Sequence, residues 1–109
     1  MLLFNPEHVQ PILDGRKTQT RRIWMRQMCR VGSIHLAKTK MLDPRYFAKL
    51  EILDVYQEKL GDISEDDAIA EGYSDEGSYL DAFQKINRIK DGVPFWMWTV
   101  FVVKFRVVP

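Results

Sequence analysis

The sequence predicts an α+β domain in which short helices flank a curved sheet or barrel. Three observations lead to this prediction: a helix-start signal near the N-terminus, two successive helix patterns after residue 63, and a long apolar strand at the C-terminus. The 109 residues and the 46% hydrophobic content are enough for one modest core. We therefore expect residues 1–109 to form a single domain.

The N-terminal helix signal is Asn5-Pro6-Glu7. Asparagine caps helices, proline suits the first helical position, and glutamate is favoured at the positive end of a helix. Pro11 disfavours continuation of the helix, and Gly15 suits a left-handed cap. These residues predict a short or broken helix that is closed by Gly15.

Three segments in the first half of the chain predict strands. Residues 18–24 are rich in β-branched and aromatic side chains, and residues 33–38 alternate between apolar and polar side chains. Residues 48–56 form the third segment, in which Leu53 interrupts the alternation. This interruption predicts either a β-bulge or a strand buried on both faces.

Two helices and a strand are predicted for the second half. Ser64 and the three acidic residues that follow it predict a helix that ends before Gly72. Ser78 is the expected cap of a second helix, whose apolar residues recur at helical spacing up to residue 89. Residues 95–108 predict a long strand across the core, with Trp96 and Trp98 on the same face.

Charge is distributed unevenly along the chain. Residues 1–40 contain eight Lys/Arg and two acidic residues, a net of +6, whereas residues 41–92 contain six Lys/Arg and thirteen acidic residues, a net of −7. The basic first third suits an anionic ligand or a nucleic acid. The alternative is that the basic residues of 1–40 form ion pairs at the surface with the acidic residues of 41–92.

The remaining composition argues against several classes of protein. The single cysteine, Cys29, excludes an internal disulfide and fits a reducing cytosol, and no apolar run approaches the length of about 20 residues that a membrane span needs. His35 has no metal-ligand partner at suitable spacing, and His8 is expected to be structural or exposed. We expect a cytoplasmic protein without a metal, a cofactor or a membrane partner.

One motif points to a known family. Gly15-x-Lys17-x-x-Thr20-x-Arg22, directly after the N-terminal helix, is similar to the signature of the ASCH family. Ala70-Glu71-Gly72-Tyr73 before a helix carrying Phe83, and the final strand with Val102-Val103-Lys104-Phe105, also fit that family. The resemblance implies a PUA-like β-barrel with flanking short helices, a cleft lined by the motif, and a role linked to RNA or nucleotides.

The resemblance also implies functional residues. RNA or a modified nucleoside is expected to contact Arg16, Lys17, Arg21, Arg22 and Tyr73. One branch of the family consists of amidohydrolases that deacetylate N4-acetylcytidine, and its catalytic Lys, Thr and Glu correspond to Lys17, Thr20 and Glu71. Another type of member is a ribonuclease.

The residues themselves set conditions on such chemistry. A threonine hydroxyl is a weak nucleophile and needs a base, and lysine can serve if burial or neighbouring arginines lower its pKa. Positions 17 and 20 point to opposite faces of an ideal strand, so a turn or bulge between them is required. Glu71 would either orient Lys17 or be held in an inert ion pair.

Three functions therefore stay open. The first is a binding module for RNA or a nucleoside, and the second is an amidohydrolase that acts on an acylated cytidine. The third is a protein-interaction domain that uses its acidic middle segment, residues 41–92.

Overall fold

A computed structural model describes residues 1–109. The strands are β1 (Leu2–Leu3), β2 (Gln19–Arg22), β3 (Ile34–Lys38), β4 (Ala48–Lys59) and β5 (Thr99–Val108). The helices are α1 (Val9–Leu13), α2 (Glu65–Ala70) and α3 (Glu76–Ile86), with the 3-10 turns η1 (Pro6–His8), η2 (Leu60–Asp62) and η3 (Phe95–Met97). None of these helices is long and apolar enough to cross a membrane.

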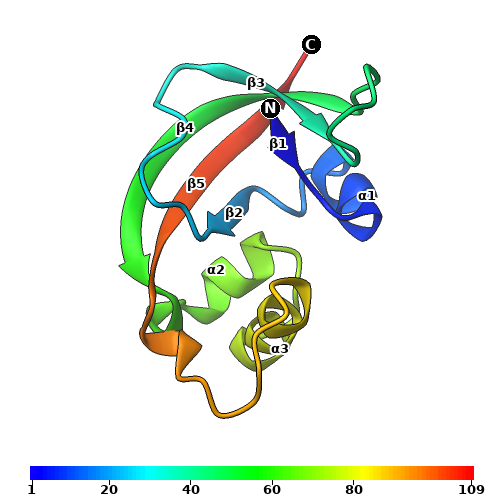
Figure 1. Cartoon of the computed structure of the whole chain (residues 1–109). Coiled ribbons are helices and arrows are strands. Elements are labelled where there is room, and N and C mark those ends of the chain that lie inside the picture. Colours follow the sequence, from blue (N-terminus) through cyan, green and yellow to red (C-terminus); the bar gives the residue numbers. More distant parts are fainter.

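The five strands form one strongly curled sheet in the order β1-β3-β4-β5-β2. The β1–β3 pair is parallel and the other three pairs are antiparallel. The long β4 and β5 strands curve around the molecule as a half-barrel, and α2 and α3 lie beneath β2 (Figure 1). The predicted α+β fold with flanking short helices is confirmed, with the barrel open rather than closed.

The β4 strand contains the irregularity that its sequence predicts. Ile52 pairs with Phe105 of the antiparallel β5, and Asp54 pairs with Lys104, the residue adjacent to Phe105. Leu53 is therefore an extra residue in the ladder, and about half of its surface is exposed. The bulge lets the buried side of the strand continue past the interrupted alternation.

The N-terminal helix is short and broken, as predicted. Pro6 occupies the first position of η1, α1 follows after His8, and Gly15 has the left-handed φ of +77°. Glycine adopts this conformation without the steric cost that a Cβ atom brings. Asn5 occupies the N-cap position of η1, as predicted, but its side chain makes no capping hydrogen bond.

The two central helices are present, with one correction. Ser64 caps α2 by accepting a hydrogen bond from the Asp67 backbone N–H. The cap of α3 is Asp75, whose carboxylate accepts from the backbone N–H of Ser78 at 2.7 Å. Ser78 is therefore not the cap but the third residue of α3, and its own backbone N–H is the donor that Asp75 satisfies.

The C-terminal strand begins later than predicted. Residues 95–97 form η3, and β5 starts only at Thr99. Trp96 and Trp98 therefore lie outside the strand, so the prediction that they share a strand face was wrong. The backbone N–H groups of Phe95, Met97 and Trp98 donate within this turn, to the carbonyls of residues 93, 94 and 95, so they do not take part in the strand ladder.

Two apolar clusters stabilise the molecule. The larger one fills the half-barrel around Ile12, Leu50 and Phe105. The smaller one packs α2, α3 and η3 against the start of β5, around Ala68 and Phe83. Five buried polar residues belong to neither cluster: Lys17, Gln19, Thr20, Arg21 and Glu71.

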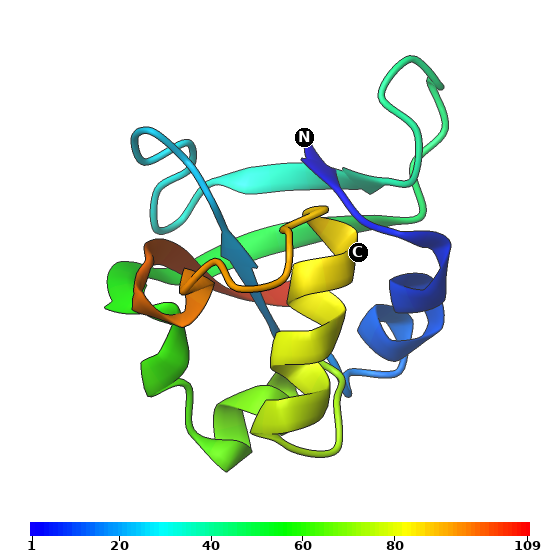
Figure 2. The same cartoon turned by 60° about the horizontal axis from the view of Figure 1, so that its bottom comes forward.

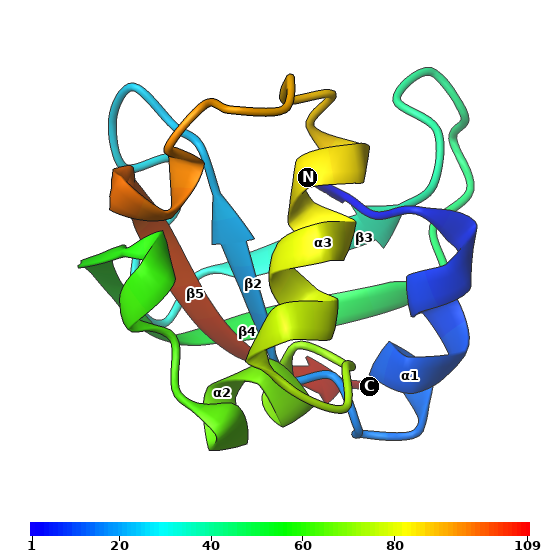
Figure 3. The same cartoon turned by 90° about the horizontal axis from the view of Figure 1, so that it is seen from below.

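The helices are arranged on one side of the sheet. Viewed from below, α3 lies in front of β3 and β4 and runs alongside β2, and α1 lies on the opposite side of α3 from β2 (Figure 3). Two loops, residues 23–33 and 39–47, extend from the sheet on either side of the N-terminus (Figure 2). The space between β2 and the helices is where the buried polar residues lie.

Candidate functional site

The β2 strand and the residue that leads into it carry the central polar side chains. β2 pairs with β5 on one side only, and it lies at the end of the sheet order. Thr18 fixes the approach to the strand, because its N–H donates to Ala70 O at 2.7 Å and its carbonyl accepts from Phe105 N–H at 3.0 Å. Lys17 is thereby held between the end of α2 and the sheet.

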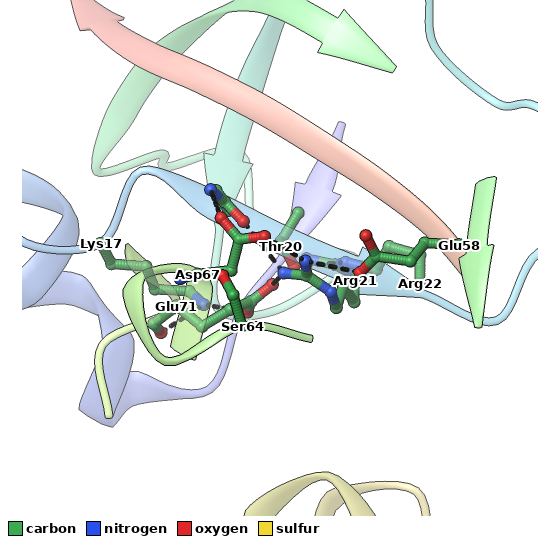
Figure 4. Close-up of polar contacts among 9 residues, drawn as sticks. Lys17, Thr20, Arg21, Arg22, Glu58, Ser64, Asp67 and Glu71 are labelled. Atoms are coloured by element: carbon green, nitrogen blue, oxygen red, sulfur yellow. Dashed lines mark hydrogen bonds and ion pairs between the residues drawn. The ribbon is translucent and has the colours of Figure 1, made fainter. Parts of the chain in front are cut away.

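Lys17 and Glu71 form a buried ion pair, with only 2% of each residue exposed. Lys17 Nζ donates to Glu71 Oε1 at 3.0 Å and to the Glu71 carbonyl oxygen at 2.8 Å (Figure 4). Burial lowers the pKa of Lys17, and the positive charges of Arg22 and Arg21 add to this, while Glu71 opposes it. Gly72, at φ +101°, lies beside the Lys17 side chain.

Arg21 lies at the centre of an ion-pair network. Its guanidinium donates to Glu71 at 2.9 Å, to Glu58 at 3.1 Å and to Asp67 at 3.3 Å. It also donates to Gln19 Oε1 at 2.9 Å. The side chain is fully buried, and its Nε is the one buried side-chain polar atom without a partner.

Arg22 has no carboxylate partner, in contrast to Arg21. Its Nε donates to Thr20 Oγ1 at 3.0 Å, and its Nη2 donates to the Leu3 carbonyl at 2.7 Å. The guanidinium carbon lies 4.8 Å from the centre of the Phe4 ring. Arg22 is therefore held in position by neutral groups, and its charge is not neutralised by an acidic side chain.

A histidine–tyrosine pair forms another part of the site. His8 Nε2 and Tyr73 Oη are 3.0 Å apart, and the two rings meet edge to face. Burial and the charges of Lys17 and Arg22 lower the pKa of His8 from 6.5 to about 4. The imidazole is therefore neutral near pH 7, as a hydrogen-bonding group rather than a cation.

These groups line one pocket of about 140 Å³ between β2, η1 and α3. Lys17, Thr20, Arg21, Arg22, Glu71 and Tyr73, which were singled out in the sequence, all line it. Arg16 does not: its side chain is exposed and pairs with Asp14 at 3.0 Å. Arg16 thus lies outside this pocket, and its contact with a ligand stays a prediction.

The three residues of the predicted catalytic trio reach the same pocket by different routes. Lys17 lies before β2, so the alternation of strand faces does not separate it from Thr20. Glu71 arrives at the C-terminal end of α2 and hydrogen-bonds to Lys17. Thr20 Oγ1 accepts from Arg22 Nε and makes no hydrogen bond to Lys17 or Glu71.

Two pocket residues were missed in the sequence. His8 was expected to be structural or exposed, yet it is half-buried and lines the pocket. Tyr79 is 4% exposed and lines the pocket, and no protein group hydrogen-bonds to its hydroxyl. Burial raises the pKa of Tyr79, so the hydroxyl stays protonated. A tyrosine one helical turn before Phe83 was the available signal for this residue.

Comparison with known proteins identifies the fold. No family model and no curated protein matches the sequence. An ASCH domain from Lactobacillus crispatus is 20% identical with a TM-score of 0.64, and the match covers 91% of this chain and 69% of that chain. A DUF984 protein from Enterococcus faecalis is 18% identical with a TM-score of 0.67, and the match covers 99% and 82%, respectively.

The chain is thus an α+β half-barrel protein with the PUA-like fold of an ASCH domain. The resemblance seen in its sequence is confirmed at the level of the fold.

Proposed function

We propose that the protein binds a nucleoside, or a nucleotide within RNA, in the pocket between β2 and α3. The observation that supports this most is Arg22, a cation that lines the pocket without a carboxylate partner. An arginine in this state suits a phosphate or a carbonyl oxygen, since its remaining N–H donors are available.

The neutral groups of the pocket suit a nucleobase. Tyr73 and Tyr79 contribute aromatic surface and hydroxyl groups, and His8 contributes an imidazole that is neutral near pH 7. Bases are recognised in proteins by stacking on aromatic rings and by hydrogen bonds to their edges. The buried Lys17–Glu71 pair would form the polar floor beneath the base.

Binding is tested by titrating cytidine, cytidine monophosphate and a short single-stranded RNA into the protein, with NMR shifts as the readout. We expect the tyrosine signals of the pocket to shift and Arg22→Gln to weaken binding by about tenfold, equivalent to about 1.4 kcal/mol. Arg16→Gln is the matched control and should leave affinity unchanged. Pocket signals unmoved by all three ligands would overturn the proposal.

A second candidate function is hydrolysis of an acylated cytidine such as N4-acetylcytidine. The observation that favours it is the Lys17 amine, which lines the pocket, is buried and hydrogen-bonds to Glu71, and whose pKa is lowered by burial. A lowered pKa favours loss of the proton, and the amine that results can act as a base. In this mechanism Thr20 Oγ1 bonds to the amide carbon, Lys17 takes the hydroxyl proton, and Glu71 assists protonation of the leaving amine. Water then releases the acyl group.

The enzyme candidate is tested by incubating the protein with N4-acetylcytidine and following release of cytidine by chromatography. We expect turnover that falls at least about 100-fold in Thr20→Val and Lys17→Met, while Thr20→Ser retains part of the rate. Thr18→Val, at an exposed threonine nearby, is the control. Cytidine release that is absent, or that persists in Thr20→Val, would contradict the mechanism. Incubated RNA is also run on a denaturing gel, because cleavage would instead indicate a ribonuclease.

A further inference from the structure

A second concavity of about 550 Å³ is lined by residues of β1 and of the loops 23–33 and 39–47. The two loops themselves can be followed in Figure 2. We call the concavity the methionine groove and define it by Ile23, Trp24, Met25, Arg26, Met28 and Met41. Eight of its eleven lining residues are apolar. Met25 is fully exposed, and Met28 and Met41 are more than half exposed, so a large apolar surface is left uncovered.

The charge of the groove has one sign. Arg22 and Arg26 line it, and no aspartate or glutamate does. Arg26 forms no ion pair, and neither does Arg30, which lies in the adjoining concavity beside Met28. An exposed apolar surface of this kind marks a binding site, and unpaired arginines around it select an acidic partner.

The chemistry of the groove favours a protein segment over a nucleic acid. Single-stranded nucleic acids stack their bases on flat aromatic rings, and Trp24 is the one aromatic residue of the groove. Its ring already packs on Phe101, with centroids 5.7 Å apart. Thioether side chains are flexible and adapt to the apolar face of a peptide, as they do in proteins that bind many helices.

A second copy of the chain is also a poor occupant. Twofold pairing would place the same surface on both sides of the interface, so Arg26 of each copy would approach arginines of the other. An acidic segment avoids this repulsion and neutralises the charge.

We propose that the methionine groove docks an acidic amphipathic segment of a partner protein. Apolar side chains of the segment insert among Met25, Met28 and Met41, and its carboxylates pair with Arg26. The inference does not depend on the ligand of the polar pocket, although the two sites share Leu3, Arg22 and Ile23.

The test uses three labelled peptides of equal length: an amphipathic Leu/Glu helix, a scrambled version of it, and the same helix with Lys in place of Glu. Binding is followed by fluorescence anisotropy and by NMR of protein labelled at its methionine methyl groups. We expect the acidic amphipathic peptide to bind at least tenfold more tightly than the other two. Binding in the groove should change the methyl chemical shifts of Met25, Met28 and Met41 and leave that of Met97 unchanged. Met97, on η3 outside the groove, is as exposed as Met41.

Two matched pairs of variants complete the test. Met25→Ser should weaken binding about fivefold, whereas Met97→Ser should not change it. Arg26→Glu should weaken binding at least tenfold, whereas Lys85→Glu, a charge reversal at an exposed position of α3, should leave it within twofold. The proposal is overturned if the three peptides bind alike, if no methionine methyl shifts at millimolar peptide, or if the same methyls respond to an RNA oligonucleotide instead.

Discussion

At the scale of single residues, the polar site depends on how two cations share one carboxylate. Glu71 pairs with both Lys17 and Arg21, and the three side chains are almost completely buried. Glu71→Gln leaves two buried cations near each other, whereas Lys17→Met leaves Glu71 paired with Arg21. We expect Glu71→Gln to lower the free energy of unfolding by about 3 kcal/mol or more, and Lys17→Met to lower it by less.

Urea denaturation of the two variants measures this difference. Both substitutions approximately preserve side-chain size, so the comparison isolates charge from packing. Equal losses, or a larger loss in Lys17→Met, would show that Glu71 is not the shared partner that the geometry indicates.

His8 makes stability depend on pH. Its pKa is about 4 in the folded protein against 6.5 for the free side chain, so between these values the unfolded chain binds the proton more readily. Protonation therefore favours unfolding, and this contribution to stability is lost as pH falls from 6.5 to about 4. We expect the melting temperature to fall across this window.

The control for this prediction is His8→Gln, which keeps a hydrogen-bonding group for Tyr73 but does not titrate. Its melting temperature should fall less steeply between pH 6.5 and pH 4 than that of the unaltered protein. An NMR titration that gives His8 a pKa near 6.5 would contradict the role of its burial and of the charges of Lys17 and Arg22.

At the scale of elements, the cap of α3 separates two interpretations of the same sequence. Asp75 accepts from the Ser78 backbone N–H, whereas the Ser78 hydroxyl has only a 3.4 Å contact with Ser74. We expect Asp75→Ala to lower the free energy of unfolding by about 1 kcal/mol and the melting temperature by about 4–8 °C. Ser78→Ala should change the free energy of unfolding little. If thermal denaturation showed Ser78→Ala to be the more destabilising of the two variants, Ser78 would be the cap.

The bulge of β4 gives a second test at this scale. Ile52 is fully buried in the half-barrel core, and the next residue, Leu53, is half-exposed because the bulge turns it outward. We expect Ile52→Ala to lower the free energy of unfolding by about 2–5 kcal/mol, and Leu53→Ala to lower it by about 0.5 kcal/mol or less. Chemical denaturation of the two variants checks the register, since comparable losses would place Leu53 in the core.

Local rules explain which elements were predictable from the sequence. Ser64, Gly15 and Leu53 act through their immediate neighbours, so the α2 cap, the left-handed turn and the bulge follow from the sequence. The β1 strand was not predicted, because two residues carry no periodicity and its order comes from pairing with β3. The late start of β5 was missed because residues 95–97 are as apolar as a strand.

The polar site was predictable in part for the same reason. The motif around Lys17 lies within one short segment, so it could be found from the sequence, and Glu71 could be placed near it only through the family resemblance. That Arg21 is enclosed by Glu58, Asp67 and Glu71 depends on contacts across 37 to 50 residues of chain. No local pattern distinguishes this buried arginine from Arg22, which has no acidic partner.

At the scale of the whole molecule, part of the uneven charge distribution is an internal pairing. Lys17 and Arg21 of the basic N-terminal third form ion pairs with three acidic residues of the middle segment. Pairing between the basic and acidic parts of the chain, which the sequence left open as an alternative to ligand binding, therefore accounts for the most buried charges. The three arginines of the N-terminal third that form no ion pair, Arg22, Arg26 and Arg30, all line concave surfaces.

This pairing also joins the two apolar clusters. The helical cluster and the half-barrel cluster are separate, and Arg21 links β2 to α2 through Asp67 and Glu71. We expect Arg21→Gln to leave these carboxylates without their main partner and to loosen the helices more than the sheet. In hydrogen exchange, amide protection in α2 and α3 should fall by about tenfold or more, with a smaller change along β4 and β5.

Arg106→Gln is the matched control, because Arg106 forms an exposed ion pair with Glu51 within the sheet. Removal of a surface pair costs little, so protection of both regions should be almost unchanged. A uniform loss of protection in Arg21→Gln would mean that the helices and the sheet open as one cooperative unit. Loss of protection confined to α2 and α3 would show that the buried ion pairs, rather than apolar contact alone, hold these two helices against the half-barrel.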